Sequence, residues 1–469
     1  MASLPEDTDV ESMNQDTDLL SEVLGTVASE IPAAIEPVHP FTAVGEPITL
    51  HEGPATLLCR VDESTPFDDP TTISVEVDGQ LIFALLPHRD FVFQCTTDDE
   101  RIGSNLFPPY QHKFGLFFPG QSSPIHMTPI SYPLLSPYEI GAIVTEEPHP
   151  LTSKEILEVQ FYLVNFPIGQ GNTTVRYDNS IASKRIHLQM DDGWVIDIDC
   201  RQDFNEVWKQ ATTQRSYTFT HVGRIKRNDF QLFSYSEVDN RLTNLFWFLS
   251  FLRGSPVGIG PIFGISDGDS PISIFRNPTI TYPAKDMISW FPKFETDHLN
   301  TLYIDFNKRM QSAHWKEVVP QLVSAYGSTS EGYVETRLTT ACSALETMTW
   351  MRLVQEQKRL TRTKYKKLQA SDKLHSLLEY CSVGIEIPEE LEELVGKANQ
   401  EQMKCPDVIQ RVRNLVVHPD KNNQLTTELK IEASRAAIWY LELTLLHLFN
   451  YRGRYVNRIS NETESVPWS

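Results

Sequence analysis

The chain has 469 residues, of which 40% are hydrophobic and 22% charged, as is usual for a soluble globular protein of two or three domains. No apolar run approaches the roughly 18 to 20 residues that span a bilayer, and the N-terminus lacks the basic and apolar regions of a signal peptide. We therefore expect a cytoplasmic protein without membrane contact. The six cysteines form no CxxC pair and lack a histidine at zinc-site spacing, which predicts reduced, mostly buried thiols and no metal site.

Charge is distributed unevenly along the chain. The net charge of −21 argues against a nucleic-acid-binding surface over the whole protein. From residue 331 to the end, however, the sequence holds 19 Lys and Arg residues against 19 Asp and Glu residues. The acidic excess therefore belongs to the N-terminal two thirds, and the C-terminal third is neutral with its charges segregated.

The N-terminal part is predicted to be a disordered leader followed by a β-rich domain. Residues 1–38 contain no Lys or Arg and are rich in Asp, Glu, Ser and Thr, which favours an acidic disordered leader. Over residues 39–295 the hydrophobic pattern mostly alternates, which indicates many short strands of a β-sandwich or barrel-like fold. Asp78–Gly79 predicts a hairpin turn, and Ser236 predicts the start of a buried helix. The expected strands cover residues 73–77, 80–83, 157–163, 194–199 and 217–225, and the expected helix covers residues 237–252.

Around residue 300 the hydrophobic period changes from two to about 3.6 residues. Val334, Leu338, Ala341, Leu345 and Met348 recur at steps of four and three, which places them on one helix face. The pattern predicts an all-α bundle of four or five helices over residues 296–455, followed by a tail at 456–469. The fold class is thus α+β multidomain, with a sandwich-like β domain before a helical bundle. Other helices are expected at about 313–325, 371–382, 388–399, from Pro406 onward, and at 427–450.

One segment of the bundle could carry chemistry. Pro419 disfavours helical geometry at His418, so the helix from Pro406 should end there, where the helix dipole stabilises a protonated imidazole. Arg413 lies about a turn earlier and could reach the same surface. Metal-independent RNA cleavage needs a base for the ribose 2′-hydroxyl, a cation for the phosphate and an acid for the leaving oxygen. One histidine can hardly be base and acid at once, so we expect a symmetric dimer with two His418 side chains across one phosphate.

The spacing from Arg413 to His418 is weak evidence alone, because roughly two such pairs are expected by chance in this composition. Three other pairs fit the same range of spacing. We interpret Arg215 with His221 as a pair on a β-strand surface and Arg309 with His314 as the start of a helix. The third is Arg411, which fits this range with the same His418. The context distinguishes Arg413: an all-α domain, Asn414 after the arginine, a proline after the histidine, and one long closing helix.

In that context the segment resembles the R-x4–6-H motif of HEPN domains, in which a polar residue often follows the arginine. Residues 335–346 resemble the upstream HEPN helix, which carries an acidic residue near the arginine, here Glu346. The match, over about residues 320–450, is closest to ApeA-like HEPN proteins of bacterial anti-phage defence, which join a β-rich domain to a HEPN bundle. The resemblance implies a dimeric, metal-independent endoribonuclease that is held inactive until infection is sensed and then arrests translation by cutting RNA, with transfer RNA as a plausible substrate. On this hypothesis the β-rich domain senses or restrains. It assigns His418 as acid and base, Arg413 to the phosphate, Glu346 as an orienting partner, and Asn414 as a weaker fourth residue. For Glu346, an exposed helix carboxylate is an equally good interpretation.

A strongly basic segment precedes the motif. It has six cations in ten residues, no acidic residue and one aromatic side chain, so it could neutralise phosphates while Tyr365 stacks on a base. A solvated face between helices explains the same pattern equally well. The predicted RNA-binding residues are Lys358, Arg359, Arg362, Lys364, Tyr365, Lys366 and Lys367.

Two other functions remain open from the sequence. The bundle could be a non-catalytic HEPN-like module that dimerises or binds RNA, with Arg413 and His418 only capping a helix. The β-rich part could instead bind a sugar or peptide and carry the main function. Phosphate-loop, HExxH and GxSxG motifs are absent, and we expect no cofactor.

Overall fold

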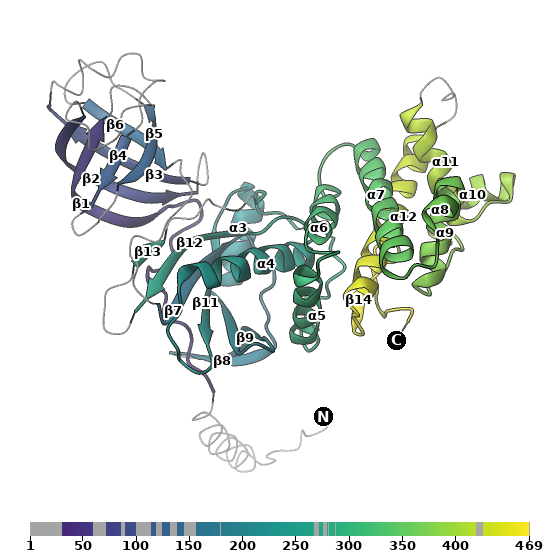
Figure 1. Cartoon of the computed structure of the whole chain (residues 1–469), viewed down its shortest axis with the longest axis horizontal. Helices are drawn as coiled ribbons and strands as arrows, with labels where there is room; N and C mark the ends of the chain where they lie inside the picture. The colour runs from purple at the N-terminus through teal and green to yellow at the C-terminus, as the bar shows by residue number, and fades with distance from the viewer. Residues whose placement is uncertain are drawn as a thin grey trace, which may run out of the picture.

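The computed structural model describes residues 31–59, 72–85, 90–99, 114–118, 124–131, 138–144, 156–178, 180–266, 272–274, 279, 281–286, 288–418 and 425–468. A β-barrel, a sheet backed by helices, and a helical region follow one another along the long axis (Figure 1). The protein thus has a mixed α/β architecture, β-rich toward the N-terminus and helical toward the C-terminus. Among the described helices, none is both long and apolar enough to cross a bilayer. Most of the predicted leader, residues 1–30, lies outside the described residues.

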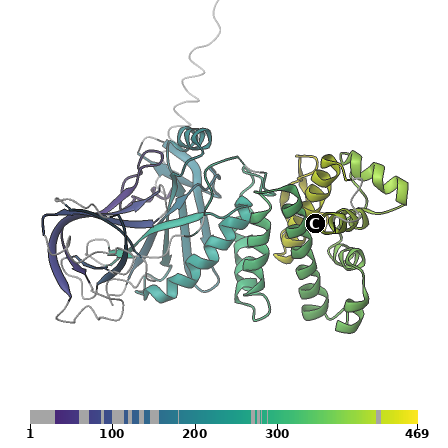
Figure 2. The same cartoon turned by 90° about the horizontal axis from the view of Figure 1, so that it is seen from above.

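The first unit is a closed antiparallel barrel with the strand order β1-β2-β3-β6-β5-β4 (Figure 2). The predicted hairpin at Asp78–Gly79 is wrong, because both residues lie in the middle of the single strand β2. A Cβ atom on Gly79 would lie 2.6 Å from the Phe93 ring, so this glycine allows close packing inside the barrel and forms no turn. The strands are β1 (Ile48–Cys59), β2 (Ile73–Ala84), β3 (Asp90–Thr97), β4 (Phe114–Phe117), β5 (Ile125–Ser131) and β6 (Tyr138–Val144).

The second unit is a seven-stranded sheet in the order β13-β12-β7-β11-β10-β9-β8. One face meets the barrel, since Tyr162 and Val222 share a core with barrel residues. The opposite face packs on a helix, since Phe161 and Ile196 share a core with Leu242. Of the two predicted folds, sandwich or barrel-like, the first unit is a closed barrel, and it lies beside a helix-backed sheet instead of forming a sandwich. The strands are β7 (Glu158–Val164), β8 (Thr173–Tyr177), β9 (Ser180–Gln189), β10 (Trp194–Cys200), β11 (Phe219–Arg227), β12 (Gly258–Ile265) and β13 (Ile272–Ile274).

Two helices interrupt this sheet, α3 (Phe204–Gln214) and α4 (Tyr235–Arg253). Helix α4 is the predicted buried helix, but it begins slightly earlier, with Ser234 and not Ser236 as its N-cap. Ser234 and Glu237 form a capping box, which satisfies amide groups at the helix start. Periodicity thus located the helix, whereas the cap depends on which serine reaches the third helical residue.

The end of the predicted leader is held against the sheet. Ala33 forms a β-bridge with Arg176, and the main-chain nitrogen of Ile35 donates to Asp199 Oδ2 at 2.6 Å. The main-chain nitrogen of Val38 donates to Gln160 Oε1 at 3.0 Å. Residues 31–38 are therefore part of the folded unit, because polar side chains of the sheet bind their backbone.

The C-terminal region is helical, with α7 and α12 packed together at its centre. The predicted helix at 313–325 corresponds to α6, which begins five residues later, and α5 is an additional helix before it. A π-helix, η2, continues α7 directly. The predicted tail forms a short hairpin whose Val466 is buried, so it belongs to the fold. The elements are α5 (Leu299–Gln311), α6 (Val318–Ser328), α7 (Val334–Thr349), η2 (Trp350–Glu356), α8 (Arg362–Lys367), α9 (Ala370–Tyr380), α10 (Glu392–Glu401), α11 (Cys405–Val417), α12 (Thr427–Leu448), β14 (Arg454–Val456) and β15 (Thr463–Ser465).

Candidate functional site

Helix α11 carries the candidate motif, and its sequence explains both of its ends. Pro406 occupies the first turn, and Asp407 Oδ2 accepts a hydrogen bond from the main-chain nitrogen of the N-cap residue, Lys404, at 3.1 Å. The helix ends at Val417, as predicted from the proline two residues later, and His418 is its C-cap. The main-chain nitrogen of His418 donates to the Asn414 carbonyl at 3.0 Å, and the His418 side chain is exposed. The imidazole is thus fixed at a helix end and open to solvent.

Arg413 and Glu346 line the same small cavity. This cavity, about 40 Å³ in volume, lies between α7, α9 and α11. Arg413 is half-buried, and its guanidinium donates to Asn414 Oδ1 at 3.2 Å. It forms no ion pair with any residue that the structure describes. The predicted acidic residue and the predicted arginine therefore come together, although 67 positions separate them in the sequence.

Glu346 forms its ion pair with Lys373, which the sequence did not single out. Lys373 Nζ lies 2.6 Å from Glu346 Oε1 and 4.5 Å from the centroid of the Tyr365 ring. The carboxylate is thus held beside Arg413 but is bound by a cation from α9. The sequence offered one indication that Lys373 belongs to the site, which was its position near the start of the predicted helix at 371–382.

Tyr365 is part of a small core and does not present its ring for base stacking, so this prediction is corrected. The residue is 6% exposed, its ring contacts Trp350 at 5.0 Å, and its hydroxyl donates to the Glu346 carbonyl at 3.2 Å. Because the ring completes the packing of η2 against α8, it contributes to structure and links the basic segment to the candidate site.

The other residues of the basic segment remain exposed. Within the described part of the chain, none of their side chains forms an ion pair, although two guanidinium groups lie over aromatic rings. These are Arg359 over Tyr380 at 4.6 Å and Arg362 over Trp350 at 5.9 Å. Such cations can bind phosphates without first releasing a carboxylate. The exposed set is Lys358, Arg359, Arg362, Lys364, Lys366 and Lys367.

The competing pair Arg215 and His221 is separated by the fold. Arg215 is the left-handed C-cap of α3, whereas His221 is 1% exposed inside the second unit. Burial lowers the pKa of His221 to about 3, and its ring nitrogens contact the Thr220 hydroxyl and the Ile168 carbonyl. This histidine is a neutral core residue.

The other two competing arginines already have carboxylate partners. Arg309 is bound by Glu356, and His314 lies in the turn that follows α5. Arg411 forms an ion pair with Glu401 at 3.1 Å. Of the arginines that match the spacing to His418, Arg413 is therefore the better placed to bind an external anion.

A second cationic cluster, which the sequence did not reveal, surrounds His447. Arg352 is 4% exposed, pairs with Glu356, and lies over the Tyr380 ring at 5.0 Å. Burial lowers the pKa of His447 to about 4, and the charges of Arg352, Arg452 and Arg309 add to this effect. The cluster lies beside the π-helix η2, a helix type that often marks functional positions.

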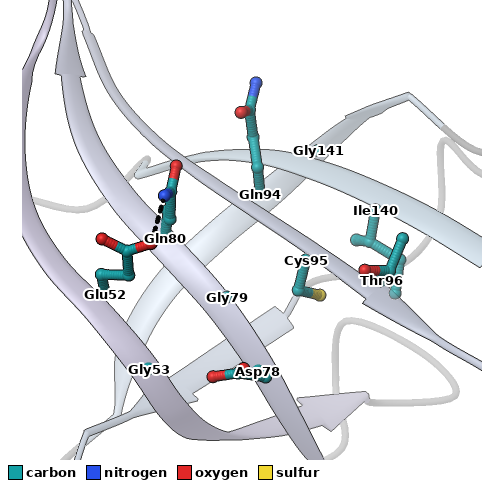
Figure 3. A pocket seen from close by; sticks show the side chains of 10 residues that line it. All are labelled: Glu52, Gly53, Asp78, Gly79, Gln80, Gln94, Cys95, Thr96, Ile140 and Gly141. Carbon is teal, nitrogen blue, oxygen red and sulfur yellow. Dashed lines mark hydrogen bonds between the residues drawn. The ribbon is translucent and has the colours of Figure 1, made fainter.

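The barrel carries a polar groove of about 460 Å³ on β1, β2, β3 and β6 (Figure 3). Gln80 Nε2 donates to Glu52 Oε1 at 2.8 Å across two strands, while Gln94 extends away from this pair (Figure 3). Gly53 and Gly79 leave its floor without side chains. Carboxylate and amide groups of this kind can hydrogen-bond a polar ligand. If the β-rich part binds a sugar or peptide, as the alternative function requires, this groove is where it could bind.

Comparisons with known proteins locate this architecture within a family. Residues 152–286 match the YopA central domain, and residues 312–467 match the YopA C-terminal domain. The SPbeta prophage-derived uncharacterized protein YopA of Bacillus subtilis (strain 168) is 30% identical over 330 residues, which are 68% of this chain and 74% of the relative. The chain belongs to the YopA family. The two matched ranges correspond to the sheet unit and to most of the helical region, and no solved structure matches significantly.

Chemically, the C-terminal domain holds an exposed imidazole, a half-buried guanidinium without a carboxylate partner among the described residues, and, on the segment at 358–367, a row of exposed cations. Such a set can bind a phosphodiester and exchange protons with it.

Proposed function

We propose that this chain is a metal-independent endoribonuclease of the HEPN type, with His418 as acid and base and Arg413 stabilising the phosphate. The observation that carries the proposal is that Arg413, on the helix that ends at His418, shares a cavity with Glu346 of α7. The exposed cations of the segment at 358–367 support it, because Tyr365 and Lys373 connect that segment to Glu346.

The proposed reaction is an internal transfer on RNA. His418 removes the proton of a ribose 2′-hydroxyl, whose oxygen then attacks the adjacent phosphorus. Arg413 stabilises the added negative charge, and a second protonated His418, from a partner copy, donates a proton to the departing 5′-oxygen. A 2′,3′-cyclic phosphate and a 5′-hydroxyl result, and the two histidines exchange protonation states. The reaction therefore requires a dimer.

The biological setting that we propose is abortive infection. The barrel and sheet units would sense or restrain, a phage-derived activator would release the helical region, and cleavage of RNA would halt translation, with transfer RNA as the first substrate to test. The description of the relative as prophage-derived fits this setting, because a resident prophage benefits when a competing phage fails.

The test is RNA cleavage in EDTA by the purified full-length chain, with transfer RNA and total RNA, with and without extract of infected cells. We expect cyclic-phosphate ends from the wild type, and loss of cleavage by about a thousandfold in His418→Ala and Arg413→Ala. Arg411→Ala is the matched control, since it removes a cation from the same helix that is already paired with Glu401. Cleavage that depends on added metal, or that survives both substitutions, contradicts the mechanism.

A non-catalytic RNA-binding or dimerisation module is the second candidate. The Lys373–Glu346 ion pair favours it, because this carboxylate already has a partner in the resting chain. The two functions differ in one outcome. RNA binding without cleavage, even with infected-cell extract present, would support the binding module.

A further inference from the structure

A cavity in the sheet unit lies away from the candidate nuclease site. Its volume is about 510 Å³, within the range typical of small-molecule sites. It is lined by the loop after β7, the β8–β9 hairpin, the first turns of α3, and the segment that leads to the helical region. Lys293 and Phe294 of that last segment lie between the two ranges that match the YopA domains.

Aromatic side chains form the apolar part of this cavity. Phe204 and Trp208 are one turn apart on α3, with ring planes inclined by 6° and centroids 6.1 Å apart. Trp208 Nε1 donates to Asp286 Oδ1 at 3.2 Å, which fixes the indole. Phe294 lines the same cavity and is 78% exposed. A large aromatic ring left in water beside a cavity gains contact area when a planar ligand covers it.

The polar part of the cavity favours anions. Lys184 and Lys293 line it, and Lys293 is exposed without an ion pair to any residue in the described ranges. The lining also holds the carboxylate of Asp286, which accepts a hydrogen bond from Trp208 and keeps its negative charge, so the two lysines leave the lining with one net positive charge. Lys184 Nζ donates to the Gln202 carbonyl at 2.8 Å and to the Arg201 carbonyl at 3.5 Å, and can still donate one further hydrogen bond.

The start of α3 adds to this preference. Asp203 is the N-cap residue but makes no side-chain capping bond. Its carboxylate is bound instead by Arg201, with Nε to Oδ1 at 2.6 Å and Nη2 to Oδ2 at 2.9 Å. Arg201 thus pairs the Asp203 charge, and the remaining acidic residue of the first turn, Glu206, does not line the cavity. The positive end of the helix, where Phe204 and Asn205 line the cavity, can therefore attract an anion.

We propose that this cavity binds a free nucleoside phosphate. The base lies against Phe294 and the edge of Trp208, and the phosphate lies between Lys293, Lys184 and the first turn of α3. The inference is independent of the proposed ribonuclease activity, since none of its residues belongs to the α11 site. A planar ring joined to a charged phosphate contacts both the aromatic side chains and the cations of the cavity. Phosphate alone contacts only the cations, and a nucleoside alone contacts only the aromatic side chains.

The test is calorimetric titration of the full-length chain in EDTA with each of the four ribonucleoside 5′-monophosphates, with adenosine, and with inorganic phosphate. We expect at least one monophosphate to bind at least tenfold more tightly than adenosine or phosphate, about 1.4 kcal/mol. Lys293→Ala should weaken binding of that nucleotide about tenfold and leave adenosine unchanged, whereas Phe294→Ala should weaken both about tenfold. Both side chains are exposed, so neither substitution is expected to disturb folding. Lys316→Ala, which removes an exposed cation elsewhere, is the control.

Photocrosslinking with an azido derivative of the nucleotide should label peptides that contain Trp208 or Phe294. Binding that is unchanged in Lys293→Ala and Phe294→Ala, or labelling confined to the helical region, would overturn the proposal. The proposal would also be overturned if a 5′-phosphorylated oligoribonucleotide displaced the bound nucleotide at a lower concentration than free nucleotide does, and bound more weakly to the Lys293→Ala variant. The ligand of the cavity would then be the end of an RNA chain.

Discussion

The seven-stranded sheet and the helices around His418 use charged side chains in opposite ways. In the sheet, Arg185 and Asp199 form an ion pair in which both side chains are 2% exposed, and Asp197 binds both His187 and Arg224. In the helical region, the cations at 358–367 are exposed and have no ion-pair partner among the described residues. Buried, paired charges fix the position of strands, whereas exposed cations without carboxylates are available to an external anion.

This difference also explains how an acidic protein could bind RNA. The net charge of −21 repels polyanions over most of the surface. The exposed cations at 358–367 form a local exception, because no carboxylate among the described residues pairs with them. If the two regions differ in this way, substitutions in the sheet should change stability, and substitutions around His418 should change RNA binding or cleavage.

The largest expected effect concerns the buried pair of the sheet. Arg185→Met should lower the free energy of unfolding by about 3 to 5 kcal/mol, because it leaves the Asp199 carboxylate buried without its cation. Arg413→Ala should change it by less than about 0.5 kcal/mol, since Arg413 has no described ion-pair partner. Urea denaturation of both variants measures the contrast. Equal losses of stability would show that the two arginines are not used differently.

An intermediate effect is expected in acid. Burial lowers the folded-state pKa of His447 to about 4, so the unfolded chain binds a proton first as the pH falls below about 6.5. The folded state should therefore lose stability between about pH 6.5 and pH 4, by up to about 3 kcal/mol from this residue. His447→Gln should make that part of the curve of unfolding free energy against pH less steep, and the slope that remains is expected from the buried His221. His314→Gln, at an exposed position, should leave the curve unchanged.

The smallest expected effect concerns the exposed cations of α8. Replacing Arg362, Lys364, Lys366 and Lys367 with Ala should weaken single-stranded RNA binding and reduce its dependence on salt, by about 0.7 in log–log slope for each phosphate that the variant no longer neutralises. The measurement is fluorescence anisotropy at several salt concentrations, in a His418→Ala background that prevents cleavage. Substituting the exposed Lys308 and Lys316 instead should leave the slope unchanged. An unchanged slope in the α8 variant would identify these cations as a solvated face.

The candidate site illustrates how far sequence reasoning reached. The end of α11 at Val417 followed from Pro419, and the position of Glu346 on the preceding helix followed from its apolar face. The pairing of Glu346 with Lys373 did not follow, because 27 positions separate them and their ion pair depends on how α7 and α9 cross. For the same reason the aromatic residue of the basic segment was misassigned. Tyr365 is buried only because η2 and Trp350 lie beside it.

The sequence by itself determined the change from strands to helices near residue 300, the neutral charge of the C-terminal third, and the end of the helix that carries Arg413 and His418. These features follow from local periodicity, from composition, and from the restriction that proline places on the preceding residue. Only the tertiary structure decided that β2 runs straight through Asp78–Gly79, that the β-rich part is a barrel beside a sheet, and that Arg413 meets Glu346. Those outcomes depend on interactions between distant segments, where packing outweighs the preference of any short stretch of chain.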